Sequence, residues 1–512
     1  MDNLSERKRN SFFQRRLTPA WADAVACVAG ALLPLAFSPF DIFPLAIFAP
    51  ALLFLLWRDI SSARAARRGF LFGIGLFGVG VSWVYVSMHN FGNMPAPLAG
   101  FAVLLFVAGL SIYPALLGWL QARFFNAGLT RHRLFVLPAL WVLFEWLRGW
   151  FLTGFPWLHL GYSQVASPLA GYAPWLGVYG VSLAVALSAG IVAQSVHEPD
   201  KALRRYLPLL LLLWAGGWFA GKMEWVQPVN GPVRVSLIQG NVPLEIKWQP
   251  KARQSIMERY MVMSSQAPKS DLIVWPEAAL PVYLDEIEGS YLENLRRLSQ
   301  AGKVDFMFGV VDRDQNTRAY YNSVVSVSPQ PGIYRKRHLV PFGEYPPLKP
   351  LFSWLMRHLQ IPMSDFSAGP KNQAPLFAGG QKIGVSICYE DAFGEEVIDA
   401  LPQATLLVNV SEDAWFGNSF APYQRIQMAR MRALETGRPL LRAANTGPSV
   451  VVDHHGTVLA RSPAFQADVL SATVQPMQGA TPYVRFGNVP VILLLVGLTI
   501  LIRKGRKISM GP

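Results

Sequence analysis

The chain contains little cysteine and little charge. Cys27 and Cys388 are its 2 cysteines in 512 residues, which excludes a disulfide-stabilised scaffold. Charged residues make up 15% of the sequence, whereas apolar residues make up 52% and the mean hydropathy is positive. The sequence also lacks repeats of solenoid length and low-complexity tracts. This composition predicts a membrane protein.

Long apolar segments recur along the chain. Most are long enough to cross about 30 Å of hydrocarbon at about 1.5 Å per helical residue, although three of them are short. The first has no clear small-residue cleavage site, so we expect no cleaved signal peptide. The segments are residues 19–37, 42–57, 70–88, 98–120, 134–150, 173–196, 207–221 and 489–502.

The net charge of +14 lies in five short polar pieces rather than across one nucleic-acid-binding face. Their basic residues exceed their acidic residues by the whole net charge, and the intervening short loops contain no lysine or arginine. Because basic loops stay on the cytoplasmic side, this alternation predicts about eight crossings with both termini in the cytoplasm. Scattered solubilising charges would not alternate in this way. The basic pieces are residues 1–20, 58–68, 121–133, 196–206 and 503–512.

The long segment between the seventh and eighth crossings alternates short apolar strands with helical patterns, which is typical of a sheet covered by helices. We therefore predict an α-helical membrane bundle carrying one α/β domain on the outer face of the membrane. The predicted regions are 1–221 for seven helices, 222–488 for the α/β domain, and 489–512 for the last helix and a basic tail. The predicted strands lie within 233–241, 271–277, 305–311, 320–328, 382–390, 404–411, 439–447 and 449–456, and the predicted helices within 250–266, 287–301, 393–401 and 420–437.

Polar residues stand at three strand ends, where α/β folds usually place their sites. Glu277 ends WPE, Lys336 and Glu344 lie in GIYRKRHLVPFGEY, and Cys388 and Glu390 lie in CYE. A carboxylate can take a proton from a thiol, and an ammonium can stabilise both the thiolate and an oxyanion. Glu277, Lys336 and Cys388 would thus suffice for acyl transfer without a metal.

Each of these residues also has an ordinary structural interpretation. A single cysteine on a strand is commonly a small core residue, a lysine between two arginines is commonly exposed, and a proline can simply end a strand. The combination of all three in one domain, in this order, favours the catalytic interpretation.

The order WPE, HLVPFGEYPP, ICYED and DAWFGNS resembles the carbon–nitrogen hydrolase (nitrilase) superfamily, and within it the bacterial apolipoprotein N-acyltransferase family. The membrane layout matches as well, so the resemblance covers nearly the whole chain. It implies a nitrilase-like α-β-β-α sandwich with Glu277 as general base, Lys336 as electrostatic stabiliser and Cys388 as nucleophile. Glu344 and Glu390 match supporting carboxylates.

The resemblance also implies that further residues take part in substrate handling. Trp248, Tyr389 and Trp415 match positions associated with substrate binding and loop movement, and Asn322 is interpreted as a site-wall or strand-pairing residue. The chain reads SEDAWF where the family pattern reads SNDAWF, so any catalytic role of Glu412 is doubtful. A loop carboxylate that caps neighbouring backbone is the simpler interpretation.

The resemblance implies transfer of a fatty acyl chain from a phospholipid to the α-amino group of the diacylglyceryl-cysteine at the N-terminus of an apolipoprotein. The partners would be the phospholipid donor, the diacylated apolipoprotein and the bilayer, with a thioester intermediate, no cofactor and no nucleic acid. His454 and His455 are expected to lack further metal ligands. Two alternatives stay open: a membrane-tethered amidase or nitrilase that uses water as acceptor, and a transporter or scaffold without catalysis.

The segment 342–362 has an apolar face flanked by basic residues. It is interpreted either as an arm lying in the headgroup layer that guides lipid to Cys388, or as a helix packed on the sandwich.

Overall fold

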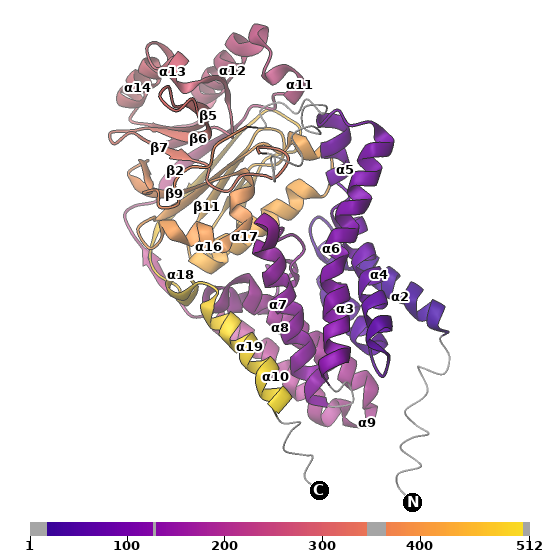
Figure 1. Cartoon of the computed structure of the whole chain (residues 1–512). Helices are drawn as coiled ribbons and strands as arrows, with labels where there is room; N and C mark the ends of the chain where they lie inside the picture. The colour runs from indigo at the N-terminus through magenta and orange to yellow at the C-terminus, as the bar shows by residue number, and fades with distance from the viewer. Residues whose placement is uncertain (1–17, 126–129, 346–364, 505–512) are drawn as a thin grey trace, which may run out of the picture. The chain divides into compact units, whose positions relative to one another are not determined.

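The computed structural model describes residues 18–125, 130–345 and 365–504, so most of the apolar arm expected at 342–362 lies outside the described residues (Figure 1). The chain divides into two compact units. The first comprises Met1–Tyr85, Ala96–Met223 and Asn488–Pro512, and the second comprises Val86–Pro95 and Glu224–Gly487. We refer to them as the helical unit and the sandwich unit.

Each apolar segment predicted from the sequence overlaps a helix of the helical unit. These helices start where capping residues and proline favour a first turn: Thr18 caps the first, which has proline at its first position, and Ser61 caps the third. The long helices are α2 (Pro19–Leu32), α3 (Leu45–Leu56), α4 (Ser62–Gly80), α6 (Ala96–Phe124), α7 (Leu137–Trp150), α8 (Ala173–His197), α10 (Leu207–Ala220) and α19 (Val489–Lys504).

Among the described residues, 4 helical stretches are long and apolar enough to cross a membrane, and up to 5 if a bent pair of helices is one span. They are Pro19–Ala36, Ala96–Phe124, His132–Thr153 and Pro168–His197, with the bent pair Ser62–Gly80 and Val84–Phe91. Helices α3 and α19 are apolar but shorter. The chain is thus a helical membrane protein, and the full set of eight crossings stays a prediction.

Helices α4 and α6 pack closely because α4 presents two glycines that lie four residues apart, Gly69 and Gly73. A Cβ atom on Gly69 would lie 2.1 Å from the carbonyl oxygen of Pro114, and one on Gly73 would lie 2.7 Å from the Cα of Ser111. Both distances are too short for any side chain. Small residues at this spacing allow two helix backbones to approach each other closely in an apolar solvent. This close packing explains how two apolar helices associate specifically.

The sandwich unit contains two large sheets. Within its described residues, a 7-stranded sheet has the order β14-β2-β3-β5-β6-β7 with β4 beside β5, and a 6-stranded sheet has the order β13-β12-β11-β10-β9-β8. A small ribbon pairs β1 with β15. The strands are β1 (Val226–Pro228), β2 (Val233–Gln239), β3 (Leu272–Val274), β4 (Leu280–Tyr283), β5 (Asp305–Arg313), β6 (Tyr320–Val327), β7 (Gly332–Arg335), β8 (Leu376–Ala378), β9 (Gln381–Ile387), β10 (Leu406–Ser411), β11 (Leu440–Ala444), β12 (Val450–Val452), β13 (Val458–Arg461), β14 (Asp468–Val474) and β15 (Met477–Gly479).

The two sheets share one apolar core. Val235 and Leu237 of β2 pack in the same cluster as Ile383 of β9 and Val408 of β10. Successive residues of a strand point to opposite faces, and Ile238 of β2 accordingly belongs to a different cluster. Strands that are apolar on both faces therefore need a covering layer on each side.

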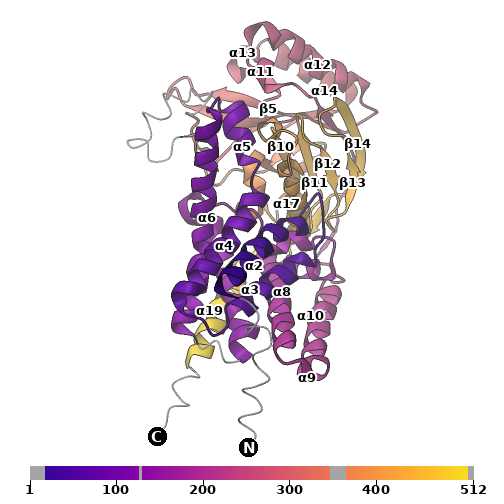
Figure 2. The same cartoon turned by 90° about the vertical axis from the view of Figure 1, so that its right-hand side faces the viewer.

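Helices supply both covering layers. Helices α12 (Arg253–Gln266) and α14 (Tyr291–Gly302) pack on the 7-stranded sheet, whereas α17 (Ala421–Thr436) packs on the 6-stranded sheet. Figures 1 and 2 show α12, α13 (Leu284–Ile287) and α14 over one outer face and α17 over the other, and Figure 1 also shows α16 (Gly394–Val397) beside α17. The predicted nitrilase-like α-β-β-α sandwich is confirmed for this unit.

Parallel strand pairs align the strand ends that matter for function. Strands β2, β3 and β5 run parallel in one sheet, and β9, β10 and β11 run parallel in the other. The carboxyl ends of parallel neighbours lie at one edge of their sheet, so loops that follow β3, β9 and β10 can share one site.

Candidate functional site

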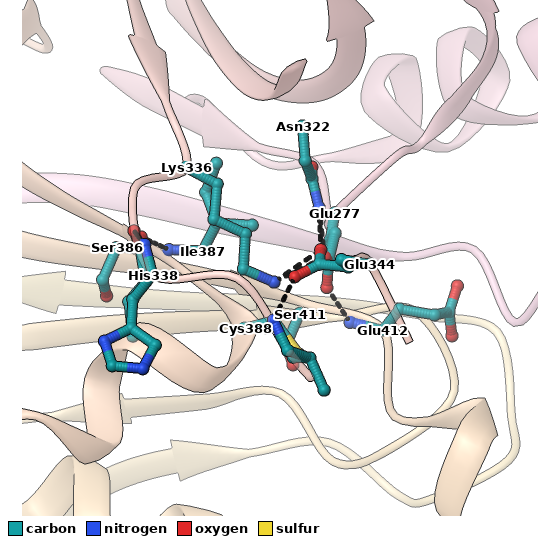
Figure 3. A network of polar contacts seen from close by, with 12 residues as sticks. Glu277, Asn322, Lys336, His338, Glu344, Ser386, Ile387, Cys388, Ser411 and Glu412 are labelled. Atoms are coloured by element: carbon teal, nitrogen blue, oxygen red, sulfur yellow. Dashed lines mark hydrogen bonds and ion pairs between the residues drawn. The ribbon is translucent and has the colours of Figure 1, made fainter. Parts of the chain in front are cut away.

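Three loops bring Glu277, Lys336 and Cys388 together (Figure 3). Glu277 follows β3, Lys336 directly follows β7, and Cys388 directly follows β9. The side chains of Lys336 and Glu277 are 1% and 8% exposed, and Cys388 is 9% exposed. The two sheets thus each contribute to one buried cluster, as the sequence predicted from the strand ends.

The ammonium of Lys336 lies between two carboxylates. Its Nζ is 2.7 Å from Oε1 of Glu344 and 3.8 Å from Oε1 of Glu277. Burial disfavours the charged lysine, but Glu344 and Glu277 outweigh this effect and raise the Lys336 pKa above its usual value. Lys336 is therefore a permanent cation at neutral pH.

Glu277 is held in place at both carboxylate oxygens. Its Oε1 accepts a 2.7 Å hydrogen bond from Nδ2 of Asn322, and its Oε2 accepts a 2.8 Å bond from the backbone N–H of Glu412. Asn322 Nδ2 also donates to Oε1 of Glu344 at 3.2 Å. Gly309 of β5 permits this arrangement, because a Cβ there would lie 2.7 Å from the Cα of Glu277.

Cys388 sits in a backbone conformation that side chains rarely adopt. Its φ is 50°, a conformation that costs a non-glycine residue about 1–3 kcal/mol and persists only where the surrounding structure enforces it. Its carbonyl oxygen accepts bonds from Asn409 Nδ2 at 3.2 Å and from Arg425 Nη2 at 2.5 Å. Burial, with the charge of Glu277, raises the pKa of the thiol to about 11. The resting sulfur is a thiol, so attack requires a base.

Glu390 ties the lysine loop to the cysteine loop. Its carboxylate accepts backbone N–H bonds from Ile387 at 2.7 Å, Arg337 at 2.7 Å and His338 at 3.2 Å. It also accepts from the hydroxyl of Tyr334 at 3.1 Å. Burial outweighs these bonds and raises the Glu390 pKa to about 7. This carboxylate fixes the backbone on both sides of the site rather than facing the sulfur.

The predicted substrate-handling residues occupy different positions. Asn322 is part of the site and also pairs β6 with β5. Tyr389 is buried with its ring against His338 and Phe393, at centroid distances of 5.6 and 4.9 Å. Trp415 is partly exposed and its ring lies 5.9 Å from that of Phe91.

Trp248 is likewise partly exposed and follows the short helix α11 (Leu244–Lys247). Its substrate role, like those of Tyr389 and Trp415, stays a prediction.

Glu412, where the sequence departs from the family pattern, forms a buried ion pair with Lys247. Nζ of Lys247 is 2.6 Å from Oε2 of Glu412, with side chains 1% and 6% exposed. Nζ also donates to the carbonyl oxygen of Glu277 at 3.2 Å. Glu412 caps the backbone of Ala414 at 3.2 Å, as the simpler interpretation expected, and in addition it belongs to the support of Glu277.

Replacing Lys247 with methionine is expected to lower the free energy of unfolding by about 3–5 kcal/mol, because it leaves the buried charge of Glu412 without its cation. Thermal melting of the purified protein measures the change. The double variant Lys247→Met/Glu412→Gln should recover most of the loss. As a control, Arg253→Met breaks an exposed ion pair with Glu286 and should cost about 1 kcal/mol or less. A Lys247→Met protein that melts like the wild type would contradict this assignment.

Arg425 is a member of the cluster that the sequence did not single out. It lies in α17, its side chain is 1% exposed, and Nη1 is 3.4 Å from Sγ of Cys388. In the sequence it is one of several arginines in a helical stretch, which is the usual pattern of a solvated helix face. No spacing signal distinguishes it, because the contact depends on how α17 packs on the 6-stranded sheet.

The histidine pair at 454–455 has an acidic neighbour that sequence order conceals. Nε2 of His455 lies 3.9 Å from Oε1 of Glu224, and one ligand atom from each of Glu224, His454 and His455 falls within 4.8 Å of the others. The prediction that these histidines lack further potential ligands is wrong. Glu224 and His455 are exposed, in the turn and linker rather than among the residues around Cys388.

Comparison with known proteins places both units in one family. Residues 29–191 match the apolipoprotein N-acyltransferase N-terminal domain, and residues 234–483 match the carbon–nitrogen hydrolase domain. An apolipoprotein N-acyltransferase of Nitrosomonas europaea is 46% identical over 96% of this chain and 97% of its own length. The same enzyme of Methylococcus capsulatus is 44% identical over 93% and 94%, and that of Vibrio cholerae is 40% identical over 96% and 97%.

Proposed function

The chain belongs to the apolipoprotein N-acyltransferase family, and from this premise we propose that Glu277, Lys336 and Cys388 perform its acyl transfer. The protein is an acyltransferase of lipoprotein maturation. The observation that carries the assignment of residues is the buried cluster itself: an ammonium 2.7 and 3.8 Å from two carboxylates, beside the nucleophilic sulfur. The acyl donor is a phospholipid, and the acceptor is the α-amino group of the diacylglyceryl-cysteine of an apolipoprotein.

In the first half-reaction Cys388 takes the acyl chain. Glu277 accepts the thiol proton while sulfur attacks the ester carbonyl of the phospholipid, and Lys336 stabilises the oxyanion that forms. The C–O bond then breaks. The leaving glycerol oxygen takes the proton from Glu277 and departs as a lysophospholipid, leaving a thioester on Cys388.

In the second half-reaction the amine of the apolipoprotein attacks the thioester. Glu277 takes a proton from the attacking nitrogen, Lys336 again stabilises the oxyanion, and the C–S bond breaks. The proton on Glu277 returns to the sulfur of Cys388. The enzyme is regenerated and the amide product leaves, so the kinetics are ping-pong.

The same residues would support an amidase that uses water as acceptor. The family relatives and the helical membrane unit favour the amine acceptor. The test is incubation of the purified protein with phospholipid and a diacylated lipopeptide, followed by mass spectrometry of the products. N-acylated peptide supports the transferase, whereas free fatty acid without acylated peptide supports a hydrolase.

A membrane site suits two lipid substrates. Moving a buried CH₂ into water costs about 0.8 kcal/mol, so extracting a sixteen-carbon chain would cost over ~10 kcal/mol. We place the enzyme in the inner membrane of a bacterium with eight crossings, residues 1–221 forming the first seven and 489–512 the last. Both termini are cytoplasmic, and the catalytic region 222–488 is periplasmic.

This topology predicts which side of the membrane two new cysteines occupy, in a chain whose native cysteines are replaced with alanine. The side chains of Glu286 and Lys201 are 36% and 54% exposed. In spheroplasts a membrane-impermeant maleimide should label Glu286→Cys and spare Lys201→Cys until the cells are lysed. Labelling of Lys201→Cys in intact spheroplasts would contradict the topology.

A further inference from the structure

The positive charge of Lys336 is already paired with carboxylates and is therefore only partly available to stabilise the sulfur of Cys388. Its Nζ lies 2.7 Å from Glu344 and 3.8 Å from Glu277, so two carboxylates face one ammonium. A thiolate forming beside this group adds a further negative charge to a buried, negative environment. Stabilising that thiolate requires another cation within reach of the sulfur.

Arg425 supplies a cation in direct contact with the nucleophile. Its Nη1 donates to Sγ of Cys388 at 3.4 Å, and its Nη2 donates to the carbonyl oxygen of the same residue at 2.5 Å. The side chain is 1% exposed. The distance to sulfur is within hydrogen-bonding range for this larger atom, and a charged donor to an anionic acceptor makes the stronger kind of hydrogen bond.

A fixed frame holds the guanidinium in this position. Nη2 lies 2.9 Å from Oδ1 of Asp391, and Nη1 donates to the hydroxyl of Ser411 at 2.6 Å. Nη1 also lies 3.4 Å from Oδ1 of Asp413, whose carboxylate is paired with Arg442 at 2.7 Å. These contacts orient the planar fork, so one nitrogen reaches the sulfur while the other holds the strained backbone of Cys388.

We propose that Arg425 is a further catalytic residue, which stabilises the negative charge on the Cys388 sulfur when the thiol is deprotonated and when the sulfur leaves from the thioester. The proposal rests on the proposed role of Cys388 as nucleophile. The two cations then have different roles: Lys336 stabilises the oxyanion, and Arg425 stabilises the negative charge on the sulfur.

The charges that face the sulfur agree with this division. Burial raises the Cys388 pKa most, and Glu277 and Glu344 raise it further, whereas Arg425 and Lys336 lower it. Asp391 and Asp413 contact Arg425 rather than the sulfur. Removing the guanidinium should therefore make Cys388 harder to ionise.

The test is the pH dependence of Cys388 alkylation by iodoacetamide in the full-length protein. A Cys27→Ala background makes Cys388 the sole thiol. Loss of one charge-assisted hydrogen bond corresponds to a fall of about 10–100-fold in thiolate population at fixed pH. Arg425→Gln should accordingly move the alkylation midpoint up by about one to two pH units and slow thioester formation from phospholipid by a similar factor. Arg425→Lys, which keeps the charge but lacks the fork, should show a smaller shift.

Arg438→Gln is the matched control. Arg438 is equally buried and donates to the carbonyl oxygens of Ala404 and Gly479, neither of which belongs to the frame around Arg425. It should lower the melting temperature and leave the midpoint of Cys388 where it is in the Cys27→Ala parent. A midpoint in Arg425→Gln equal to that of the parent, whatever its stability, would reduce Arg425 to a structural residue and overturn the proposal. If Arg425→Gln does not fold, Arg425→Lys replaces it in the test, and an Arg425→Lys midpoint equal to that of the parent would overturn the proposal.

Failure of the proposed function gives a different result. A parent protein whose Cys388 is alkylated normally but never carries an acyl group from phospholipid would refute the role of Cys388 as nucleophile. The alkylation midpoints would still report whether Arg425 controls the sulfur.

Discussion

Replacement of Cys388 with alanine is expected to lower the rate of lipopeptide N-acylation by at least about 10⁴-fold, the scale seen when an enzyme loses its covalent nucleophile. The reaction has no other route, because the acyl chain must rest on the enzyme between donor and acceptor. The buried sulfur occupies the turn that follows β9, and alanine there removes the thiol while keeping the backbone. The measurement is the initial rate of N-acylated peptide formation from phospholipid.

The second cysteine provides the control for this experiment. Cys27 lies in α2 of the helical unit, so Cys27→Ala should retain the wild-type rate. Melting curves of both variants establish that they fold. A Cys388→Ala protein that acylates peptide within about tenfold of the wild-type rate would rule out the covalent mechanism, since loss of a nucleophile costs far more.

Replacement of Glu277 with glutamine should slow acyl-enzyme formation by about 10²–10⁴-fold, the usual contribution of a general base. Glutamine preserves the size of the side chain but cannot take the thiol proton. The variant should also acquire a new pH dependence. Burial still raises the Cys388 pKa in this variant, although the charge of Glu277 no longer adds to it, so thiolate is scarce at neutral pH. Without the base, the rate should rise about tenfold per pH unit above pH 7, until the pH reaches the pKa of the thiol, as the thiol ionises by itself.

A matched control separates the base from the mere loss of a buried carboxylate. Glu435 is fully buried and pairs with Arg432 at 3.0 Å, so Glu435→Gln removes a comparable charge from α17. It should lower the melting temperature and leave the pH profile of acylation unchanged. A Glu277→Gln enzyme with the wild-type rate and a flat profile would assign the base to another residue.

The sequence predicted the layers of the sandwich unit because its strands are apolar on both faces. Apolar residues that face the shared core recur at the two-residue period of a strand in β2 and β9, and each of the eight predicted strand segments overlaps an observed strand. Seven strands were not predicted: β1, β4, β7, β8, β13, β14 and β15. Six of them have three or four residues, too few for a clear periodicity, and β14 has seven but is buried at one residue, so it lacks a continuous apolar run. The described helices match the apolar segments, but three of them are too short for length alone to establish a crossing.

The cluster around Cys388 was predictable only where residues follow strand ends. Glu277, Lys336 and Cys388 each come directly after, or within three residues of, a strand. Arg425 and Lys247 lie on helices. Arg425 contacts Cys388 from 37 positions away in the sequence, and Lys247 contacts Glu412 from 165 positions away. In a single sequence, a buried arginine or lysine on a helix looks the same as an exposed one, because only the packing of the fold brings its partners to it.

The most direct test of the account is intact-protein mass spectrometry of the Cys27→Ala enzyme after exposure to phospholipid without acceptor. Covalent catalysis predicts an added mass of one fatty acyl chain, located on Cys388 by peptide mapping, removed by hydroxylamine and transferred to a diacylated lipopeptide on its addition. An enzyme that forms N-acylated peptide while Cys388 never carries an acyl group would contradict it.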